Sequence, residues 1–128
     1  MKISKGMLNH YVDYITGWYI TEHNVPADEL TGYYNYVLKI QAKAAKYQDL
    51  EPLRLGINYL RCHPEIDVKD YGDSLYPWDN EEVREILDYI CFVIWGENPK
   101  KVNCEEVKNV ELIDMDRHDW WKMRGVRP

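Results

Sequence analysis

Few residues of the chain have the types and spacing that catalysis or metal binding would need. Cys62-His63 places a thiol beside an imidazole, the pair of groups used in nucleophilic acyl transfer. Neighbouring residues of a helix point about 100° apart, and an acyl-transfer site also needs an orienting group. We therefore interpret this pair as a buried structural cysteine and a histidine at a helix end.

A second set of candidates lies on the first predicted helix, around Tyr11. His10 and Asp13 are three residues apart, and Glu22-His23 ends the same helix. Imidazole and carboxylate groups at helical spacing can bind a metal ion in a bundle. A histidine near a helix end more often interacts with the helix dipole. A small helical enzyme or metal-binding protein using these four residues is our second hypothesis.

Two carboxylate pairs, Glu81-Glu82 and Asp114 with Asp116, are candidates for acid/base chemistry or for a divalent cation. Helix capping accounts for the first pair, and the spacing of the second does not match a calcium-binding loop. The sequence also lacks a phosphate-binding glycine loop and the common hydrolase motifs. It therefore favours a non-catalytic protein over an enzyme and predicts no catalytic residue, no metal ligand and no cofactor.

The C-terminal tail, residues 117–128, is both basic and aromatic. Its two tryptophans, Trp120 and Trp121, are interleaved with four cationic side chains: Arg117, Lys122, Arg124 and Arg127. Ring stacking combined with cationic contacts is how single-stranded nucleic acids are bound. A single-stranded nucleic-acid binder acting through this tail is our third hypothesis. The simpler interpretation is an ionic match with the preceding acidic segment, with the tryptophans packed against the bundle.

The net charge of −6 is unevenly distributed along the chain. Residues 1–64 are close to neutral at +1, residues 65–116 carry −10, and residues 117–128 carry +3. A strongly acidic surface repels nucleic acid and attracts a basic partner. We therefore expect no direct binding to duplex DNA.

Residues 65–88 combine nine acids, two basic groups and three large rings. Protein interfaces are rich in Tyr and Trp at their centre, while surrounding charges select the partner. We predict a protein-binding site formed by Asp67, Asp70, Asp73, Tyr76, Trp78, Glu81, Glu82 and Glu85. The alternative is a solvated acidic loop in which Tyr76 and Trp78 pack the start of the following helix onto the core.

The same region is similar to the immunity proteins of nuclease colicins. The resemblance rests on His63-Pro64 and on Leu75-Tyr76-Pro77-Trp78-Asp79-Asn80, followed by an acidic helix start. It covers only these short stretches, the two dipeptides are farther apart here than in that family, and this chain is longer. That family consists of small acidic helical inhibitors, so the resemblance implies a protein that blocks a basic enzyme.

Hydrophobic periodicity predicts the helices that would carry these residues. One helix runs from Leu8 to the stop at Asn24-Val-Pro26, and a second runs from Pro26 or Asp28 to Lys46. Residues 50–62 fit both helical and strand spacing, and we choose a helix that ends at His63-Pro64.

A fourth helix is predicted to start at Asp79, which forms a capping box with Glu82. Residues 89–95 are apolar on every side, which predicts a central helix buried all round. Residues 109–114 fit either a short helix or an edge strand. The predicted fold is a mainly α, single-domain bundle of four to five helices spanning residues 1–128.

The three cysteines cannot all pair within the chain, and none forms a CxxC motif. We therefore predict neither a disulfide framework nor a zinc site, which indicates a reducing compartment. The first residues lack the apolar core of a signal peptide, and the longest apolar run is too short for a bilayer. The sequence thus predicts a soluble, cytoplasmic protein.

Our leading hypothesis is a non-catalytic, acidic inhibitor or adaptor. It would cover the nucleic-acid-binding surface of a basic partner, such as a nuclease or a nucleic-acid-handling complex. An immunity protein and a phage-encoded anti-defence inhibitor both fit this description. No membrane partner is expected, and the many Tyr and Trp residues also leave room for a homodimer.

Overall fold

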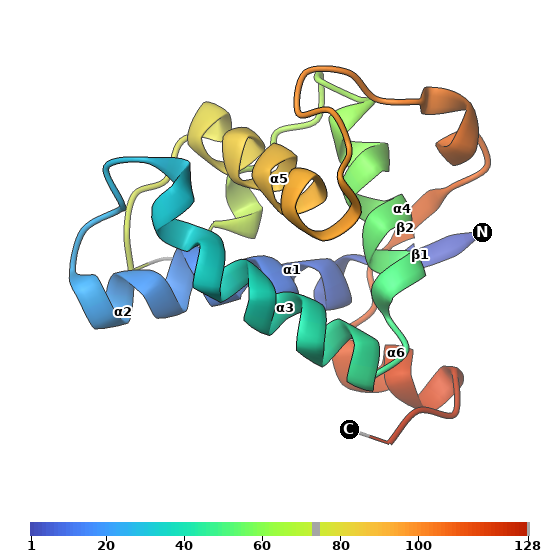
Figure 1. Cartoon of the computed structure of the whole chain (residues 1–128). Coiled ribbons are helices and arrows are strands. Elements are labelled where there is room, and N and C mark those ends of the chain that lie inside the picture. Colours follow the sequence, from blue (N-terminus) through green and yellow to red (C-terminus); the bar gives the residue numbers. More distant parts are fainter. Residues whose placement is uncertain (73–74, 128) are drawn as a thin grey trace.

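The computed structural model describes residues 1–72 and 75–127, and its ribbon is mainly helical (Figure 1). The chain begins with strand β1 (Lys2–Ser4), followed by one continuous helical stretch: α1 (Lys5–Asp13), a π-helical segment η1 (Tyr14–Tyr19) and α2 (Ile20–His23). The Ser4 hydroxyl caps this stretch by accepting from the Met7 amide. The first predicted helix is confirmed, although it starts before Leu8 and contains a wide π-helical turn.

The next two predicted helices are also present. The 3₁₀ segment η2 (Leu30–Tyr33) leads into α3 (Tyr34–Lys46), so this helix starts later than Pro26 or Asp28. Helix α4 (Leu50–Arg61) confirms the choice of helix over strand for this segment. Its side chains at helical spacing are almost fully buried: Leu53, Ile57 and Leu60.

Helix α5 (Asn80–Trp95) starts with the predicted capping box between Asp79 and Glu82. The expectation that residues 89–95 are buried on every side is wrong at the end of this helix. Phe92 is 52% exposed, and residues 93–95 are only half-buried. The reason is that α3 and α4 pack against α5 on its inner side and leave the outer side of its last turn open (Figure 1).

The remainder of the chain alternates short helical segments with one strand: η3 (Lys69–Tyr71), η4 (Cys104–Val107), β2 (Glu111–Ile113) and α6 (Arg117–Met123). Strands β1 and β2 pair in parallel, with Lys2 opposite Glu111 and Ser4 opposite Ile113. The sequence allowed either a short helix or an edge strand at residues 109–114, and the structure has the strand. Sequence periodicity missed β1, because three residues are too few to establish an alternating pattern.

The buried side chains form one hydrophobic cluster to which every layer of helices contributes. The largest fully buried ones come mainly from α1, η1 and the helices α3 to α5, and include Tyr11, Met7, Ile15, Ile40, Ile57 and Ile90. The mainly α prediction is confirmed. Among the described residues, none of the helices combines the length and apolar character needed to cross a membrane.

Cys62 at the end of α4 and Cys104 in η4 form a disulfide. The prediction that the cysteines stay unpaired is therefore wrong for these two. They are 42 residues apart in sequence, and only the packing of η4 on α4 brings them together, so their spacing carried no signal. Cys62 is consequently not a nucleophile in this state. Cys91 is free and buried, and burial raises the pKa of its thiol to about 12.

Candidate protein-binding site

The structure divides the predicted acidic contacts between two hollows of the surface. Asp67 and Asp70 line a cleft of about 650 Å³, whereas Glu82 and Glu85 line a smaller cavity of about 170 Å³ at the start of α5. Asp73 lies outside the described residues. The predicted set is therefore not one continuous patch, and the larger cleft is the stronger candidate for a binding site.

The rings of the same segment are oriented differently from the prediction. Trp78 is only 7% exposed, and its Nε1–H donates to the Thr16 carbonyl at 3.0 Å. Tyr76 is half-buried and contacts Trp78 edge-to-face, with 5.0 Å between ring centroids. The expectation that the Trp78 ring is exposed to solvent for binding is therefore wrong. The indole packs against apolar side chains and donates to an acceptor inside the molecule. Glu81, by contrast, is exposed in the first turn of α5.

The larger cleft, here called the acidic cleft, is built by four segments that are distant in sequence. The start of α1, the end of α4, the 66–71 segment and strand β2 each supply part of its wall. Among the described residues, its lining includes four carboxylates, Asp67, Asp70, Glu111 and Asp114, and one lysine, Lys5. Sequence reasoning missed Glu111 and assigned Asp114 to another pair, because β2 reaches the cleft only through its pairing with β1.

The acidic cleft keeps much of its negative charge available to a ligand. Lys5 Nζ lies 3.2 Å from Asp114 Oδ1 and Lys69 Nζ lies 3.6 Å from Asp67 Oδ2, but all four side chains are exposed and such pairs are weak. Burial raises the pKa of Tyr71 to about 12, and the nearby charges of Asp114 and Asp70 add to this rise. The carboxylates of the cleft thus oppose the ionisation of a tyrosine in its wall, in addition to the larger effect of burial.

The remaining wall of the acidic cleft is apolar and rigidly supported. Tyr59 and Leu60 at the end of α4 line it, and the Tyr59 ring stacks on His63 with 4.1 Å between centroids. Arg84, on α5, donates to the carbonyl of Leu60 at 2.9 Å, to that of His63 at 3.0 Å and also to that of Ile66. One half-buried guanidinium therefore holds the turn that follows α4 in place. This role of Arg84 had no signal in the sequence.

The basic C-terminal tail is packed against the bundle around one carboxylate. Trp120 and Trp121 are each 3% exposed, and their Nε1–H groups donate to Asp49 at 2.9 Å and 2.7 Å. The Tyr11 hydroxyl and Arg124 Nη1 donate to the same carboxylate at 2.5 Å and 2.7 Å. We call these five residues the Asp49 cluster.

The Asp49 cluster decides between the two interpretations of the tail. The predicted packing of the tryptophans on the bundle is confirmed, but the ionic partner is Asp49 rather than the acidic segment. Both indoles are buried and hydrogen-bonded, so they cannot stack on nucleic-acid bases in this conformation. The third hypothesis, single-stranded nucleic-acid binding through the tail, required these two rings to be accessible for stacking. It therefore has no stacking rings in this structure.

The helix-borne groups of the second hypothesis are engaged in separate local contacts. Burial lowers the pKa of His10 to about 4, with Arg117 as the next contribution. The carboxylate of Glu22 accepts from the Tyr36 hydroxyl at 2.7 Å, and His23 stacks on a tyrosine ring one turn earlier. Within residues 1–72 and 75–127, no three His, Cys, Asp or Glu side chains are grouped as metal ligands would be. The geometry thus gives no support to a metal-ligand role for His10, Asp13, Glu22 or His23.

No protein-family model matches the chain, and comparisons with curated proteins and with solved structures found no significant match. The resemblance to colicin immunity proteins gains no support from these comparisons. The site must therefore be interpreted from its own geometry.

Proposed function

We propose that this protein is a non-catalytic inhibitor or adaptor that binds a basic protein through the acidic cleft. The observation that supports the proposal most directly is the composition of the cleft, where the part of the chain that the structure describes places four carboxylates and one lysine around apolar and tyrosine walls. Such a surface suits the side chain of an arginine or lysine, whose aliphatic stem packs on rings while its charged head meets carboxylates. Asp67, Asp70, Glu111 and Asp114 are the proposed contacts.

The proposed partner is a nuclease or a nucleic-acid-handling complex. The phosphate-binding surface of such a protein is basic, so exposed carboxylates compete for the groups that would bind phosphate. Occupation of that surface would exclude the nucleic acid both sterically and electrostatically. An immunity protein or a phage-encoded anti-defence inhibitor would act in this way.

The cellular location follows from the sequence only in part. We propose a cytoplasmic protein, on the basis that the sequence has only three cysteines and that Cys91 is a free thiol. The Cys62–Cys104 disulfide weighs against this location, because disulfides are uncommon in reducing compartments. The redox state of these two cysteines in protein isolated from cells would decide the point.

A labelled oligoarginine peptide provides a direct test of the acidic cleft. We expect the peptide to bind the wild-type protein, with an affinity that falls as the salt concentration rises. The double variant Asp67→Asn/Asp114→Asn should weaken binding about tenfold, equivalent to about 1.4 kcal/mol. Fluorescence anisotropy at low and at high salt measures both effects.

A matched control separates the cleft from the overall negative charge. Glu65→Gln/Glu105→Gln removes the same formal charge from exposed positions that do not line the cleft. The control should bind the peptide within about twofold of wild type, since screened surface charges contribute little. Equal losses in the two double variants would show generic charge attraction and would refute the site. Inhibition of a basic nuclease, competitive with its nucleic acid, then tests the wider proposal.

A further inference from the structure

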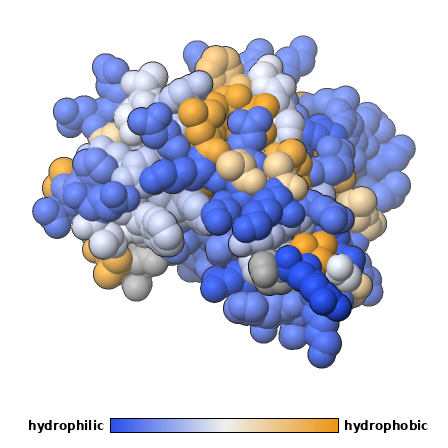
Figure 2. Space-filling model, turned by 60° about the horizontal axis from the view of Figure 1, so that its bottom comes forward, coloured by the Kyte–Doolittle hydropathy of each residue, from blue (hydrophilic) through white to orange (hydrophobic). Residues whose placement is uncertain are grey.

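Positive charge is concentrated at one end of the molecule, where the end of α3 meets α6 (Figure 1). Residues 34–48 contain three lysines and no acid, and residues 117–127 contain four Lys or Arg residues and one Asp. Each segment thus carries +3, and the rest of the chain carries −12. Figure 2 brings this end forward, and mainly hydrophilic side chains cover it. We call its exposed basic side chains the basic face: Lys43, Lys46, Arg117, His118, Lys122 and Arg127.

Two rings in contact join the α3 half of the basic face to the α6 half. Tyr47, directly after α3, meets Trp121 of α6 edge-to-face, with 4.9 Å between ring centroids. Lys43 Nζ and Lys46 Nζ lie 6.0 Å and 5.6 Å from the centroid of the Tyr47 ring. The His118 ring lies 6.0 Å from that of Trp121. The cationic groups of the two helices are therefore arranged around one pair of rings.

The imidazole of His10, which contacts the same tryptophan ring, is influenced by charges from both helices. Burial is the main cause that lowers the pKa of His10 to about 4. The charges of Arg117 and His118 on α6 and of Lys43 on α3 act in the same direction, and the buried carboxylate of Asp49 opposes them. Cationic groups of α3 and α6 are therefore close enough to act on one ring.

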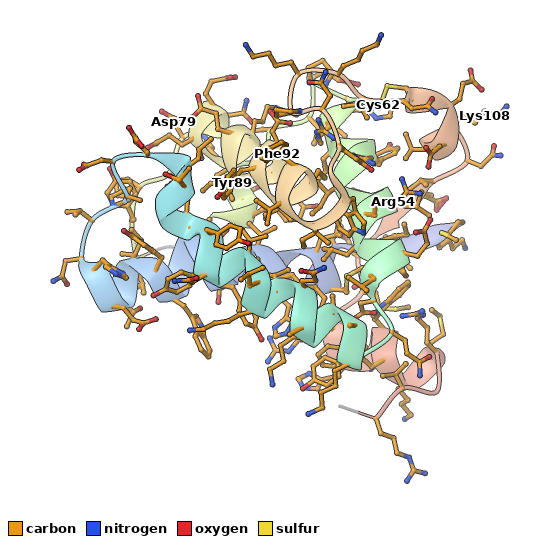
Figure 3. The ribbon with its side chains drawn as sticks, viewed as in Figure 1. Arg54, Cys62, Asp79, Tyr89, Phe92 and Lys108 are labelled. Carbon is orange, nitrogen blue, oxygen red and sulfur yellow. A yellow bond between two sulfur atoms is a disulfide. The ribbon has the colours of Figure 1, made fainter. Side chains whose placement is uncertain are left out.

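The basic face differs from the other cationic groups of the molecule in its lack of carboxylate partners. Arg54 on α4 (Figure 3) forms ion pairs with three glutamates, and Arg61 pairs with Asp88 and Glu97. Within residues 1–72 and 75–127, none of the basic-face side chains forms an ion pair. Their charge is thus available to an external anion.

The α6 half of the basic face also contains a hollow. His118, Lys122 and Arg127 line a cavity of about 420 Å³, and its described lining includes no acid. The acids nearby belong to the start of α6, where the Asp116 carboxylate accepts from the Asp119 amide at 2.8 Å. Lys and Arg side chains that converge on one hollow suit a phosphate group, to which they donate charge-assisted hydrogen bonds.

We propose that the basic face binds the phosphate backbone of a single-stranded nucleic acid. Unpaired Lys and Arg gathered on one face are typical of nucleic-acid-binding surfaces, and phosphate contacts supply most of their affinity. A single strand is thin enough to follow this face. A duplex or a folded acidic protein would also approach the acidic remainder of the surface and be repelled there.

This mode of binding differs from stacking on the tail. Trp120 and Trp121 are buried and Arg124 is paired with Asp49, so none of the three is proposed as a contact. Lys43, Lys46 and His118 take their place. Because the contacts are to phosphates, the affinity should not depend on the bases.

The basic face and the acidic cleft share no residue. The proposal therefore does not rest on the proposed function, and either one can fail alone. The variant Asp67→Asn/Asp114→Asn, which tests the cleft, should still bind a single strand at least as tightly as wild type.

Fluorescence anisotropy with a short labelled oligothymidine tests the basic face on the full chain. We expect the wild-type protein to bind at low salt, with a logarithmic salt slope of about −0.7 for each phosphate contacted. Lys122→Gln/Arg127→Gln and Lys43→Gln/Lys46→Gln should each weaken binding about tenfold and reduce the slope by about 1.4. Losses in both variants would show that α3 and α6 contribute to one surface.

A matched control is Lys100→Gln/Lys101→Gln, which removes the same charge from two exposed lysines outside the basic face. It should bind the oligonucleotide within about twofold of wild type, since distant exposed charges are screened by salt. All of these substitutions change exposed side chains, and circular dichroism checks that the fold is kept. A wild-type protein that fails to bind, or equal losses in the control and in the basic-face variants, would overturn the proposal.

Competition experiments identify the kind of polyanion. Unlabelled oligoadenine of the same length should displace the labelled strand as well as oligothymidine does, because neither is recognised through its bases. Stronger competition by an oligoglutamate peptide would assign the basic face to an acidic protein, and stronger competition by vesicles of anionic phospholipid would assign it to a membrane. Either result would overturn the proposal.

Discussion

Carboxylates are used in opposite ways in the Asp49 cluster and in the acidic cleft. Asp49 is fully buried and accepts hydrogen bonds from Tyr11, Trp120 and Trp121, in addition to its ion pair with Arg124. The Asp114 side chain in the cleft is 93% exposed and contacts Lys5. A buried charge is tolerated only where donors surround it, which leaves it nothing to offer a ligand. Charge that can bind a partner is therefore found where such donors are few.

The Asp49 cluster also shows what many of the Tyr and Trp residues do in this protein. Tyr and Trp carry a polar group that needs a partner when the ring is buried. Here Asp49 satisfies two indoles and one phenol, and the Thr16 carbonyl satisfies Trp78. Rings that look in sequence like surface contacts thus serve to fasten α6 and the start of α5 to the bundle.

The largest effect that would test this contrast is expected for Asp49→Ala. The substitution leaves two indole N–H groups, one phenol and one guanidinium without their acceptor inside the molecule. Loss of one partner from a buried ion pair costs about 3–5 kcal/mol, so we expect the free energy of unfolding to fall by about that amount. Urea denaturation followed by tryptophan fluorescence measures the change, since Trp120 and Trp121 report on the same region.

The matched variant in the acidic cleft is Asp114→Ala. Its exposed ion pair with Lys5 should contribute less than about 1 kcal/mol to stability, so its unfolding curve should nearly overlap that of wild type. If the two alanine variants were equally destabilised, the division between structural and available carboxylates would be wrong.

Trp78→Phe should produce an intermediate loss of stability. Phenylalanine keeps most of the buried apolar surface but leaves the Thr16 carbonyl without the indole donor that now lies 3.0 Å away. An unsatisfied buried group costs about 1–3 kcal/mol, and denaturation should show a loss in this range. Affinity for the oligoarginine peptide should stay unchanged, because Trp78 does not line the acidic cleft. A large loss of affinity at unchanged stability would return Trp78 to the binding surface.

The helices were predictable because their signals are local. The spacing of Leu53, Ile57 and Leu60 and the capping box of Asp79 with Glu82 involve residues within one or two turns. The same reasoning failed at Phe92, because periodicity shows that a segment is apolar but not whether a neighbour covers it.

The candidate site was predictable only in part because its wall is assembled from distant segments. Asp67 and Asp70 were identified from the local concentration of charge, but Glu111 joins them only through the pairing of β2 with β1. The Cys62–Cys104 disulfide depends in the same way on tertiary packing. Each of these contacts spans about forty residues or more, beyond the reach of any pattern in the chain.

The smallest effects are expected in the pH dependence of the unfolding free energy, which should differ between the Asp49 cluster and the acidic cleft. His10 contacts Trp121 of the Asp49 cluster, and burial lowers its pKa from 6.5 to about 4. The unfolded chain binds the proton more tightly, so this contribution to stability is complete above pH 6.5 and is lost as the pH falls through about 4. His10→Gln should therefore reduce the dependence of the unfolding free energy on pH in this range, relative to wild type.

Tyr71 in the acidic cleft should respond at the opposite end of the pH scale. Burial, with Asp114 and Asp70, raises its pKa from 10.0 to about 12, so the unfolded chain loses the proton first. Its contribution to stability is complete below pH 10 and is lost as the pH rises through about 12. Tyr71→Phe should flatten the alkaline limb alone, whereas His10→Gln should flatten the acid limb alone. Because the two groups belong to separate regions, a variant that altered both limbs would show that the Asp49 cluster and the cleft influence each other in the folded state.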